Sequence, residues 1–542
     1  MFGLMQDWPL LMHKVLDHAA IQHPGREIIS RSVEGPFHRT DYRAVRQRAL
    51  RLAQRLERDG IRLGDRVATL AWNTWRHVEA WYGITGIGAI YHTVNPRLFP
   101  DQIAWILNHA GSRVLMLDLT FIPLIQQLAP KLEHIERFII LTDGAHLPET
   151  GLRNAVAYED WLAEADGDFA WASFDEKTAA GLCYTSGTTG DPKGVLYSHR
   201  SNILHALACN QVDCLGLGVA DRVMPVVPMF HANGWSLPIS APMAGATLVL
   251  PGAKLDGASV HEIITEAQVN FSAAVPTVWM MLLQHMEATH TRVDSLKRVV
   301  IGGSACPAAI TQTYQEKYGV RVIHAWGMTE MSPVGTTYQR KPEIAGLDPA
   351  AALALQAKQG CPPFTVEMKI TDDEGRDLPW NGEVFGRLTV RGPSITRNYF
   401  KRDDEAVLDA DGFFDTGDVA TIDTHGFMEV TDRSKDVIKS GGEWISSIAL
   451  ENAAVGYPGV AEAAVVAMYD PKWDERPVVC VVKKPGSSVT VADLLKFYEG
   501  KTAKWQIPDD AIFVDSIPLG ATGKMLKTKL REQLAGYKLP TL

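Results

Sequence analysis

Two hydrophobic patterns alternate along the first 300 residues. From Tyr42 to Leu56 apolar side chains recur at helical spacing, and the pattern ends at Gly60. The strand-like run RVATLAW (66–72) follows. Further along, the alternation predicts a helix at 101–109, a strand at 113–118, a helix at 121–132 and a strand at 137–141. Because helices that alternate with strands cover the faces of parallel sheets, this part predicts an α/β fold of helix-covered, mainly parallel sheets.

The pattern changes after residue 380. Short strands punctuated by glycine, as in EVFGRLTVRG (383–392), predict a β-rich subdomain, and an Ala-rich segment just before them (349–357) predicts a helix. Near residue 432 the polar stretch TDRSKDVIKSGGEW precedes two strand-like segments and a helix at 491–500. The end of the chain is therefore expected to form a small α+β unit.

Composition narrows the class of protein. The chain has 542 residues, of which 46% are hydrophobic and 21% charged, with a formal net charge of −10. These values exclude a mostly disordered or collagen-like chain. The acidic balance also gives no reason to expect a nucleic-acid partner or attraction to an anionic membrane. A large enzyme without nucleic-acid partners is the default interpretation.

The stretch from Val223 to Ala253 contains no Asp, Glu, Lys or Arg, which resembles the charge pattern of a membrane span. Five prolines interrupt it, so we interpret it as buried strands and loops of a large core, and we expect no integral membrane segment. The first 20 residues have Asp7 early and no basic region or cleavage site. They predict an amphipathic helix rather than a signal peptide.

The six cysteines show neither C-x-x-C pairs nor zinc-ligand spacing. They predict free, mostly buried thiols in a reducing, cytoplasmic environment.

A polar loop between two strand-like segments has the strongest local chemistry. Its sequence is Tyr184-Thr-Ser-Gly-Thr-Thr-Gly-Asp-Pro-Lys-Gly194. Glycines allow a backbone to approach a ligand closely, and consecutive N–H groups in such a loop bind anions. Lys193 adds a positive charge, so the loop predicts a polyphosphate site. A simple Gly- and Thr-rich turn is the structural alternative, and the spacing does not fit the G-x-x-x-x-G-K-[ST] motif.

This loop resembles the phosphate-loop signature of the adenylate-forming superfamily, which includes acyl-CoA synthetases, amino-acid adenylation domains and firefly-type luciferases. The resemblance extends over essentially the whole chain. It implies that the nucleotide phosphates contact Thr185, Ser186, Gly187, Thr188, Thr189, Gly190 and Lys193.

The segment Trp326-Gly-Met-Thr-Glu330 matches a second motif of that family. By resemblance, Trp326 stacks on adenine, Thr329 contacts the α-phosphate, and Glu330 holds Mg²⁺ together with Thr185. A carboxylate suits this hard cation. The adenine-binding residues implied besides Trp326 are Gly303, Ser304, Ala305, Ala325, Gly327 and Met328.

Two motifs invite other interpretations. Gly302-Gly-Ser-Ala-Cys306 lacks the last glycine of the G-x-S-x-G elbow of serine hydrolases. Phe414-Asp-Thr-Gly-Asp418 contains the triplet of aspartic proteases, but those enzymes need two carboxylates that share a proton. By resemblance, Asp418 binds the ribose hydroxyls of the nucleotide, and Arg433 is a second ribose or phosphate contact.

The resemblance also divides the chain. It implies an ATP- and acyl-binding N-terminal domain at 1–433 and a mobile C-terminal domain at 434–542, with a hinge near Lys435. Lys524, in PLGATGK, would contact the substrate carboxylate and the α-phosphate. The loop that lines the pantetheine tunnel would consist of Lys439, Ser440, Gly441, Gly442, Glu443 and Trp444.

Pro228-Met-Phe-His-Ala-Asn-Gly-Trp235 matches the acyl-pocket motif of acyl-CoA synthetases. His231 and Trp235 are its candidate pocket residues, although His231 also fits a hydrogen-bonded core histidine. Amino-acid-activating relatives place an Asp here, and this stretch has none, so the acid is expected to have an uncharged, apolar body. The predicted pocket comprises His231, Trp235, Gly302, Gly303, Trp326 and Pro333.

The resemblance implies a two-step ligase that uses ATP, Mg²⁺ and coenzyme A, with Lys524, Glu330, Thr185 and His231 as its catalytic residues. The pattern most resembles bacterial medium-chain fatty-acyl-CoA ligases and methylmercaptopropionate-CoA ligases. We therefore expect 3-(methylthio)propionate and short- or medium-chain fatty acids as substrates, and a homodimer. The alternatives are a general medium- or long-chain synthetase, a ligase that loads a carrier protein, and a non-catalytic nucleotide-binding scaffold.

Overall fold

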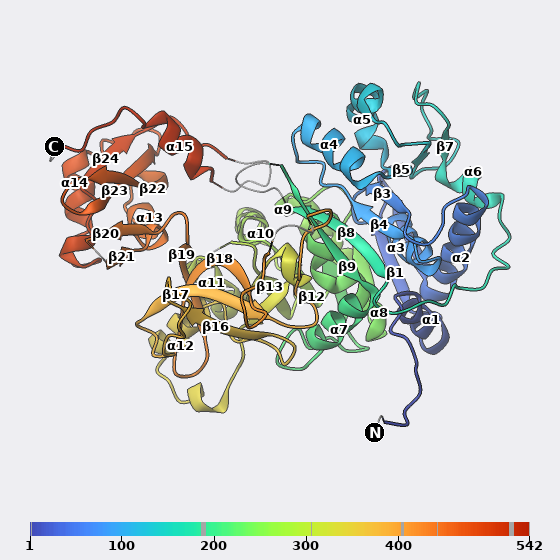
Figure 1. Ribbon diagram of the computed structural model, residues 1–542, viewed down its shortest axis with the longest axis horizontal. Coiled ribbons are helices and arrows are strands. Elements are labelled where there is room, and N and C mark those ends of the chain that lie inside the picture. Colours follow the sequence, from blue (N-terminus) through green and yellow to red (C-terminus); the bar gives the residue numbers. More distant parts are fainter. Residues whose placement is uncertain are drawn as a thin grey trace. The chain divides into compact units, whose positions relative to one another are not determined.

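The computed structural model describes residues 1, 3–185, 191–304, 306–402, 406–441, 443–519 and 525–540. The chain forms two compact units (Figure 1). Unit 1 consists of Met1–Glu367 and Arg391–Phe414, and unit 2 consists of Met368–Val390 and Asp415–Leu542. The division at 433/434 and a hinge near Lys435 stay predictions.

Unit 1 contains a seven-stranded sheet in the order β7-β6-β5-β3-β4-β8-β9. All neighbouring strands in it are parallel except β8 and β9, which form an antiparallel hairpin at one edge. Its strands are β3 (Arg66–Leu70), β4 (Ile90–Thr93), β5 (Val114–Leu117), β6 (Arg137–Ile140), β7 (Ala155–Ala157), β8 (Ala179–Thr185) and β9 (Lys193–Ser198).

Unit 1 also contains an eight-stranded sheet in the order β15-β14-β13-β12-β10-β11-β1-β2. The six central strands are parallel, and β15 and β2 are antiparallel edges. Its strands are β1 (Glu27–Arg31), β2 (Phe37–Asp41), β10 (Arg222–Pro225), β11 (Thr247–Leu250), β12 (Phe271–Ala274), β13 (Arg298–Ile301), β14 (Arg321–Gly327) and β15 (Val334–Thr337). The predicted α/β class with mainly parallel sheets is confirmed.

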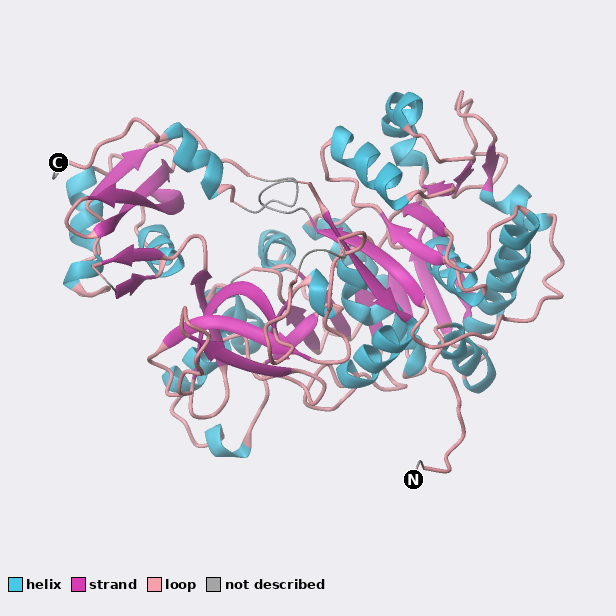
Figure 2. Ribbon diagram, in the orientation of Figure 1, coloured by secondary structure: helices cyan, strands magenta, loops and turns pink. Residues whose placement is uncertain are grey.

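Helices cover these sheets (cyan in Figure 2). The α-helices of unit 1 are α1 (His13–Gln22), α2 (Tyr42–Arg58), α3 (Trp75–Gly86), α4 (Pro100–Ala110), α5 (Ile122–Leu128), α6 (Tyr158–Ala163), α7 (His199–Cys209), α8 (Leu237–Met243), α9 (Gly257–Ala267), α10 (Pro276–Thr289), α11 (Ala308–Tyr318) and α12 (Pro349–Ala357). Its 3₁₀ helices are η1 (Leu119–Phe121), η2 (Ala129–Lys131), η3 (Ala232–Ser236), η4 (Thr329–Met331) and η5 (Pro342–Ile344).

Local signals explain where several helices begin and end. The Asp41 side chain accepts a hydrogen bond from the Ala44 N–H and caps α2, while α4 ends at Gly111, whose left-handed backbone (φ 61°) suits glycine. The predicted helix at 349–357 is confirmed, and Asp348 caps it. The predicted N-terminal helix begins only at His13, four residues after Pro9.

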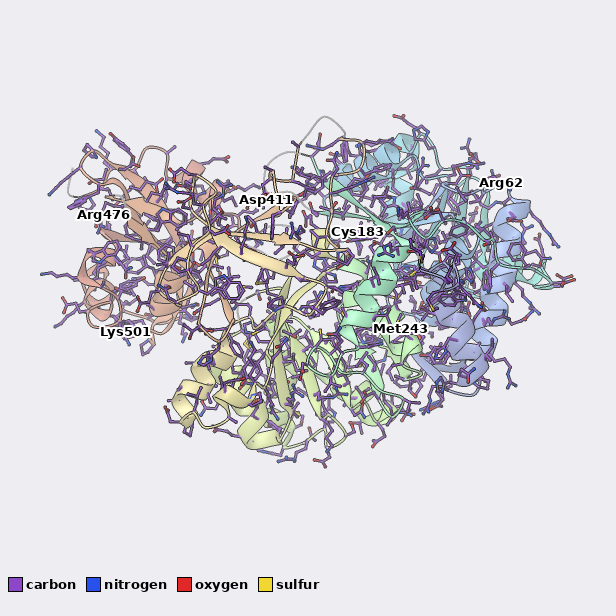
Figure 3. The ribbon with its side chains drawn as sticks, turned by 60° about the horizontal axis from the view of Figure 1, so that its bottom comes forward. Arg62, Cys183, Met243, Asp411, Arg476 and Lys501 are labelled. Carbon is purple, nitrogen blue, oxygen red and sulfur yellow. The ribbon has the colours of Figure 1, made fainter. Side chains whose placement is uncertain are left out.

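The uncharged stretch from Val223 to Ala253 lies in the core, as predicted. It forms β10, η3, α8 and β11, and nearly all its residues are buried, with hydrophobic side chains in the cluster that also includes α3. The helix α8 was not expected in a stretch so rich in proline. Pro238 lies in its first turn, where proline lacks no needed N–H, and Pro242 lies at its end. Figure 3 shows the dense side chains around Cys183 and Met243 in unit 1.

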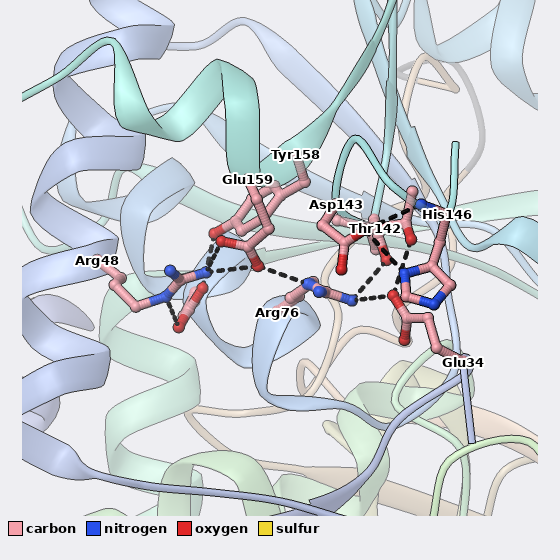
Figure 4. A network of polar contacts seen from close by, with 10 residues as sticks. Glu34, Arg48, Arg76, Thr142, Asp143, His146, Tyr158 and Glu159 are labelled. Atoms are coloured by element: carbon pink, nitrogen blue, oxygen red, sulfur yellow. Dashed lines mark hydrogen bonds and ion pairs between the residues drawn. The ribbon is translucent and has the colours of Figure 1, made fainter. Parts of the chain in front are cut away.

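A partly buried network of charges joins α2, α3 and α6 (Figure 4). Arg76 pairs with Glu34 at 2.7 Å and with Glu159 at 2.8 Å, and Arg48 joins Glu159 to Glu79, which has no exposed surface. Each buried carboxylate in this network has a guanidinium partner, which offsets the loss of hydration.

Unit 2 contains two further sheets, one four-stranded (β16-β17-β18-β19) and one five-stranded, in which β24 joins the path β21-β20-β23-β22 through β23. The strands are β16 (Glu367–Thr371), β17 (Phe385–Arg391), β18 (Phe414–Ile422), β19 (Met428–Arg433), β20 (Ile438–Ser440), β21 (Glu443–Ile445), β22 (Val460–Asp470), β23 (Asp474–Lys483) and β24 (Asp510–Phe513); residues Glu367, Arg391 and Phe414 at strand ends belong to unit 1. The helices are α13 (Ser447–Val455), α14 (Val491–Phe497), η6 (Lys504–Gln506) and α15 (Lys527–Gln533). The predicted β-rich subdomain and α+β unit are both confirmed.

Two predictions about the whole chain can be compared with the structure. All six cysteines are free and buried, as expected. In the described part of the chain, no helix has both the length and the apolar character that a bilayer crossing requires.

Candidate active site

The predicted phosphate loop connects β8 to β9. Thr185, the last residue of β8, pairs across the hairpin with Lys193, the first residue of β9. The hairpin therefore holds both ends of the loop side by side. Ser186, Gly187, Thr188, Thr189 and Gly190 lie outside the described residues. The Gly194 carbonyl accepts a hydrogen bond of 2.8 Å from the Phe400 N–H, which attaches the segment 391–402 to the hairpin.

Tyr399 joins the phosphate loop to the predicted magnesium ligand. The Lys193 ammonium lies 4.6 Å from the centre of the Tyr399 ring, and the Tyr399 hydroxyl donates to Glu330 Oε1 at 2.9 Å. Glu330 is only 7% exposed, and its carbonyl accepts from the Thr396 N–H. The structure thus brings the predicted residues Lys193 and Glu330 together around an aromatic ring.

The motif at 326–330 spans the end of β14 and the beginning of η4. A Cβ atom at Gly327 would lie 1.9 Å from the Pro333 carbonyl oxygen, so only glycine fits this close approach. The Met328 N–H donates to the same carbonyl at 3.0 Å. The Thr329 carbonyl accepts from the Tyr197 hydroxyl at 2.7 Å, and burial raises the pKa of that phenol well above its usual range. Tyr197 therefore stays protonated and holds this backbone in place.

The predicted adenine-binding residues are at the ends of β13 and β14. Trp326 is half-buried. Its ring packs closely against Gly335, because a Cβ at Gly335 would lie 2.5 Å from Trp326 Cζ3. Gly303 and Ser304 are exposed at the end of β13, whereas Ala325 is buried. Ala305 lies outside the described residues. Because β13 and β14 are neighbouring parallel strands, their carboxyl ends form one edge.

The predicted acyl-pocket segment contains an unusual backbone. Five consecutive residues, Ala232–Ser236, have positive φ between 44° and 65°. We call this segment the left-handed turn. Four of its residues are not glycine, and each such residue costs on the order of 1–2 kcal/mol in this conformation. His231 is half-buried just before the turn, and Trp235, near its end, is only 8% exposed.

Trp235 packs against the end of β13. A Cβ at Gly302 would lie 3.2 Å from Trp235 Cη2 and 2.8 Å from the Ala325 carbonyl oxygen. A Cβ at Gly303 would lie 3.6 Å from Trp235 Cζ2. The structure thus brings together Trp235, Gly302 and Gly303, all three of which the sequence placed in the acyl pocket.

Unit 2 contains the predicted ribose contacts. Asp418 in β18 pairs with Arg433 in β19, and Arg433 Nε lies 2.9 Å from Asp418 Oδ1. Asp418 is buried, so this contact provides a charge partner for its carboxylate. Lys435, two residues beyond β19, is exposed.

The predicted pantetheine segment forms the hairpin β20–β21, in which Lys439 pairs with Trp444 and Ser440 with Glu443. The Lys439 ammonium lies 5.3 Å from the Trp444 ring centre and 3.2 Å from Asp373 Oδ2. Gly441 begins the connecting turn with φ 62°. Gly442 and the adenylation residue Lys524 lie outside the described residues.

Tyr399 and Tyr197 were not identified from the sequence. Tyr399 stands in RNYF and Tyr197 in VLYSH, and neither segment has the spacing of a binding motif. Their contacts to Glu330 and Thr329 arise only when segments distant in sequence come together.

Comparisons with known proteins show the family to which the chain belongs. The family model described as AMP-binding enzyme matches residues 16–400, and its C-terminal domain matches residues 449–524. The chain belongs to the AMP-binding enzymes. The family resemblance predicted from the motifs is thus confirmed.

Individual relatives narrow the enzyme class. The chain is 47% identical to the 3-methylmercaptopropionyl-CoA ligase of Ruegeria pomeroyi, covering 98% of this chain and 99% of that protein. It is 45% identical to the medium-chain-fatty-acid–CoA ligase of Ectopseudomonas oleovorans, covering 98% and 97%. The anthranilate CoA ligase AuaEII, solved with anthranoyl-AMP, superposes with a TM-score of 0.84 at 26% identity, covering 98% of this chain and all of that one. This AMP-binding enzyme is an acid–CoA ligase, as the motifs predicted.

Proposed function

We propose that this AMP-binding enzyme joins short- and medium-chain carboxylic acids to coenzyme A, with 3-(methylthio)propionate as the preferred acid. The position of the Trp235 indole is the observation that supports this choice of acid. Because the indole lies against Gly302 and Gly303, it shortens the space that an acyl chain could fill. The two relatives named for 3-methylmercaptopropionate and medium-chain fatty acids support this size range. A thioether packs much like a methylene group, so fatty acids of similar length are substrates too.

The first half-reaction forms an acyl adenylate. The substrate carboxylate attacks the α-phosphorus of ATP, the bond to the β-phosphate oxygen breaks, and diphosphate leaves. The carboxylate is itself the nucleophile, so the protein supplies position and charge rather than a covalent intermediate. Lys193 provides positive charge beside the phosphates, and Lys524 offsets the repulsion between the carboxylate and the α-phosphate.

Mg²⁺ accompanies ATP in this proposal, and Glu330 and Thr185 would hold it. The donor set fits, because Mg²⁺ usually binds one or two carboxylates together with substrate phosphates. Within the described ranges, no group of three or more His, Cys, Asp or Glu side chains could form a cage made of protein alone. When bound, the ion would neutralise charge on the phosphates. Tyr399 orients the Glu330 carboxylate through its hydrogen bond.

In the second half-reaction the thiol of coenzyme A attacks the acyl carbonyl, and AMP leaves. We propose that the C-terminal domain (434–542) rotates about Lys435 between the two steps, so that Lys524 departs and the β20–β21 hairpin approaches. Gly441 suits a backbone that lies against a thin pantetheine arm, because it carries no side chain.

A diphosphate-release assay tests the choice of acid. The purified protein is supplied with ATP, Mg²⁺ and coenzyme A, and with 3-(methylthio)propionate, straight-chain acids from butyrate to palmitate, or benzoates. We expect the highest kcat/KM for 3-(methylthio)propionate and acids of similar length. A clear preference for benzoates or for long chains would refute the assignment. Diphosphate release without an acyl-CoA product would instead point to a carrier-protein acceptor.

The proposal includes three finer points that need their own measurements. Addition of EDTA should abolish activity, and Mg²⁺ should restore it. Light scattering should give the mass of a homodimer. Cell fractionation should find the protein in the cytoplasm.

A further inference from the structure

Three buried side chains form a closed ring of hydrogen bonds at the left-handed turn. The Tyr91 hydroxyl donates to Asn233 Oδ1 at 2.9 Å and accepts from Asn202 Nδ2 at 3.2 Å. Asn233 Nδ2 donates to Asn202 Oδ1 at 3.2 Å, which closes the ring. Each of the three side chains is at most 1% exposed. We call this set the amide ring.

The amide ring joins three elements that are distant in sequence. Tyr91 lies in β4 of the seven-stranded sheet, Asn202 in α7, and Asn233 in the left-handed turn. The Tyr91 ring is itself held by Trp81 of α3, which stacks on it at 4.4 Å with an angle of 7°. Because the three hydrogen bonds form a closed cycle, the Asn233 amide has a single orientation in it relative to the sheet.

The left-handed turn needs such an anchor. L-residues rarely adopt this conformation in series, and they keep it only where the surrounding structure fixes it. Asparagine tolerates left-handed backbone better than Ala232, Trp235 or Ser236 does. Asn233 therefore both suits the conformation and holds it in place through the amide ring.

Trp235 follows Asn233 by two residues, so the anchor also sets the position of the indole against Gly302. We infer that the amide ring of Tyr91, Asn202 and Asn233 is a positioning device that determines how long an acyl chain the enzyme accepts. The ring is buried, so we expect it to act through the position of Trp235 rather than through contacts of its own with the substrates. This inference rests on the proposed function of Trp235 as a wall of the acyl pocket.

The test compares two variants that break the amide ring. Tyr91→Phe removes the hydroxyl and keeps the aromatic side chain that stacks on Trp81. Asn233→Gly removes the amide, but glycine adopts the left-handed backbone conformation without strain, so this variant is expected to fold. In both, we expect kcat/KM for decanoate relative to 3-(methylthio)propionate to rise about tenfold, which corresponds to one buried hydrogen bond, while KM for ATP stays within about twofold.

Tyr314→Phe is the matched control. Its hydroxyl is also buried and donates to the Trp279 carbonyl at 2.9 Å, in the part of the core between α10 and α11. If both ring variants lose thermal stability like this control and keep the wild-type ratio of the two acids, the ring is merely structural and the inference is wrong.

Trp235→Ala separates the inference from the proposal beneath it. If this variant accepts decanoate and the ring variants do not, the pocket assignment stands and only the inference fails. If Trp235→Ala leaves the ratio of the two acids unchanged, Trp235 is not a wall of the acyl pocket, and both the proposed pocket and the inference fail.

Discussion

Asp118 should make unit 1 less stable at neutral pH than at mildly acidic pH. It is buried after β5, where Oδ2 accepts from the Trp72 N–H at 2.6 Å. Among the described residues, Oδ1 has no hydrogen-bond partner. Burial is the main cause that raises the pKa of this carboxyl from 3.8 to about 7, and the charge of Glu34 adds to it. The carboxylate form is therefore unfavourable in the folded state.

The sign and size follow from linkage. Between the unfolded pKa and the folded pKa, the folded state binds more protons, so the free energy of unfolding falls as pH rises and is constant above about pH 7. Between pH 5 and pH 8, the free energy of unfolding falls only over the about two pH units from pH 5 to the folded pKa. At ~1.36 kcal/mol per pH unit, the fall amounts to about 3 kcal/mol. Asp118→Asn removes the titration and keeps an oxygen that accepts from Trp72.

Urea denaturation at pH 5 and pH 8, followed by circular dichroism, measures this effect. The replacement of Asp by Asn also changes the free energy of unfolding by an amount that does not depend on pH. This amount cancels when the difference between variant and wild type is compared at the two pH values. We expect that difference to favour Asp118→Asn by about 3 kcal/mol more at pH 8 than at pH 5. Asp294→Asn, whose side chain is 87% exposed, is the control. A difference that does not change with pH would show that Asp118 ionises as readily as an exposed carboxyl.

Three further predictions concern the proposed active site. Tyr399→Phe removes the hydrogen bond to Glu330 and should lower kcat/KM for ATP about tenfold, while the melting temperature changes little. A lower melting temperature with an unchanged kcat/KM for ATP would contradict the role of Tyr399 in orienting Glu330. Gly441→Ala places a Cβ 2.8 Å from Trp473 in a backbone with φ 62°, so thioester formation should slow more than diphosphate release, as single-turnover assays of the two steps will show. Lys524→Ala should abolish adenylation far more than thioester formation from supplied acyl adenylate, and an equal loss of both would refute this division of roles.

The sequence predicted those helices whose pattern is complete within one short segment of the chain. The helices α2 and α4 were predicted from an apolar pattern that ends at a glycine, and α12 from its Ala-rich composition. The helix α8 was missed because its prolines argued against a helix, although proline in the first turn is tolerated.

Site residues follow the same division. Contiguous motifs predict Lys193 and Glu330 as site residues, and the structure places both against the Tyr399 side chain. Tyr399, which connects them, has no local signal, and its role depends on the segment 391–402 reaching the β8–β9 hairpin. The left-handed turn could not be predicted either. Its sequence contains only one glycine, and the conformation is imposed by partners such as Tyr91, which is more than 100 residues away.

The place of β1 in the eight-stranded sheet has a consequence for synthesis of the chain. Ile28 pairs with Leu248 of β11, so the first strand has only β2 beside it until the middle of the chain has left the ribosome. At ordinary elongation rates, the intervening stretch of roughly 220 residues takes about 10–40 s to synthesise. During that time the hydrophobic face of β1 lacks its native cover. Nascent chains of this enzyme should therefore depend on chaperones from early in translation until β11 has been synthesised.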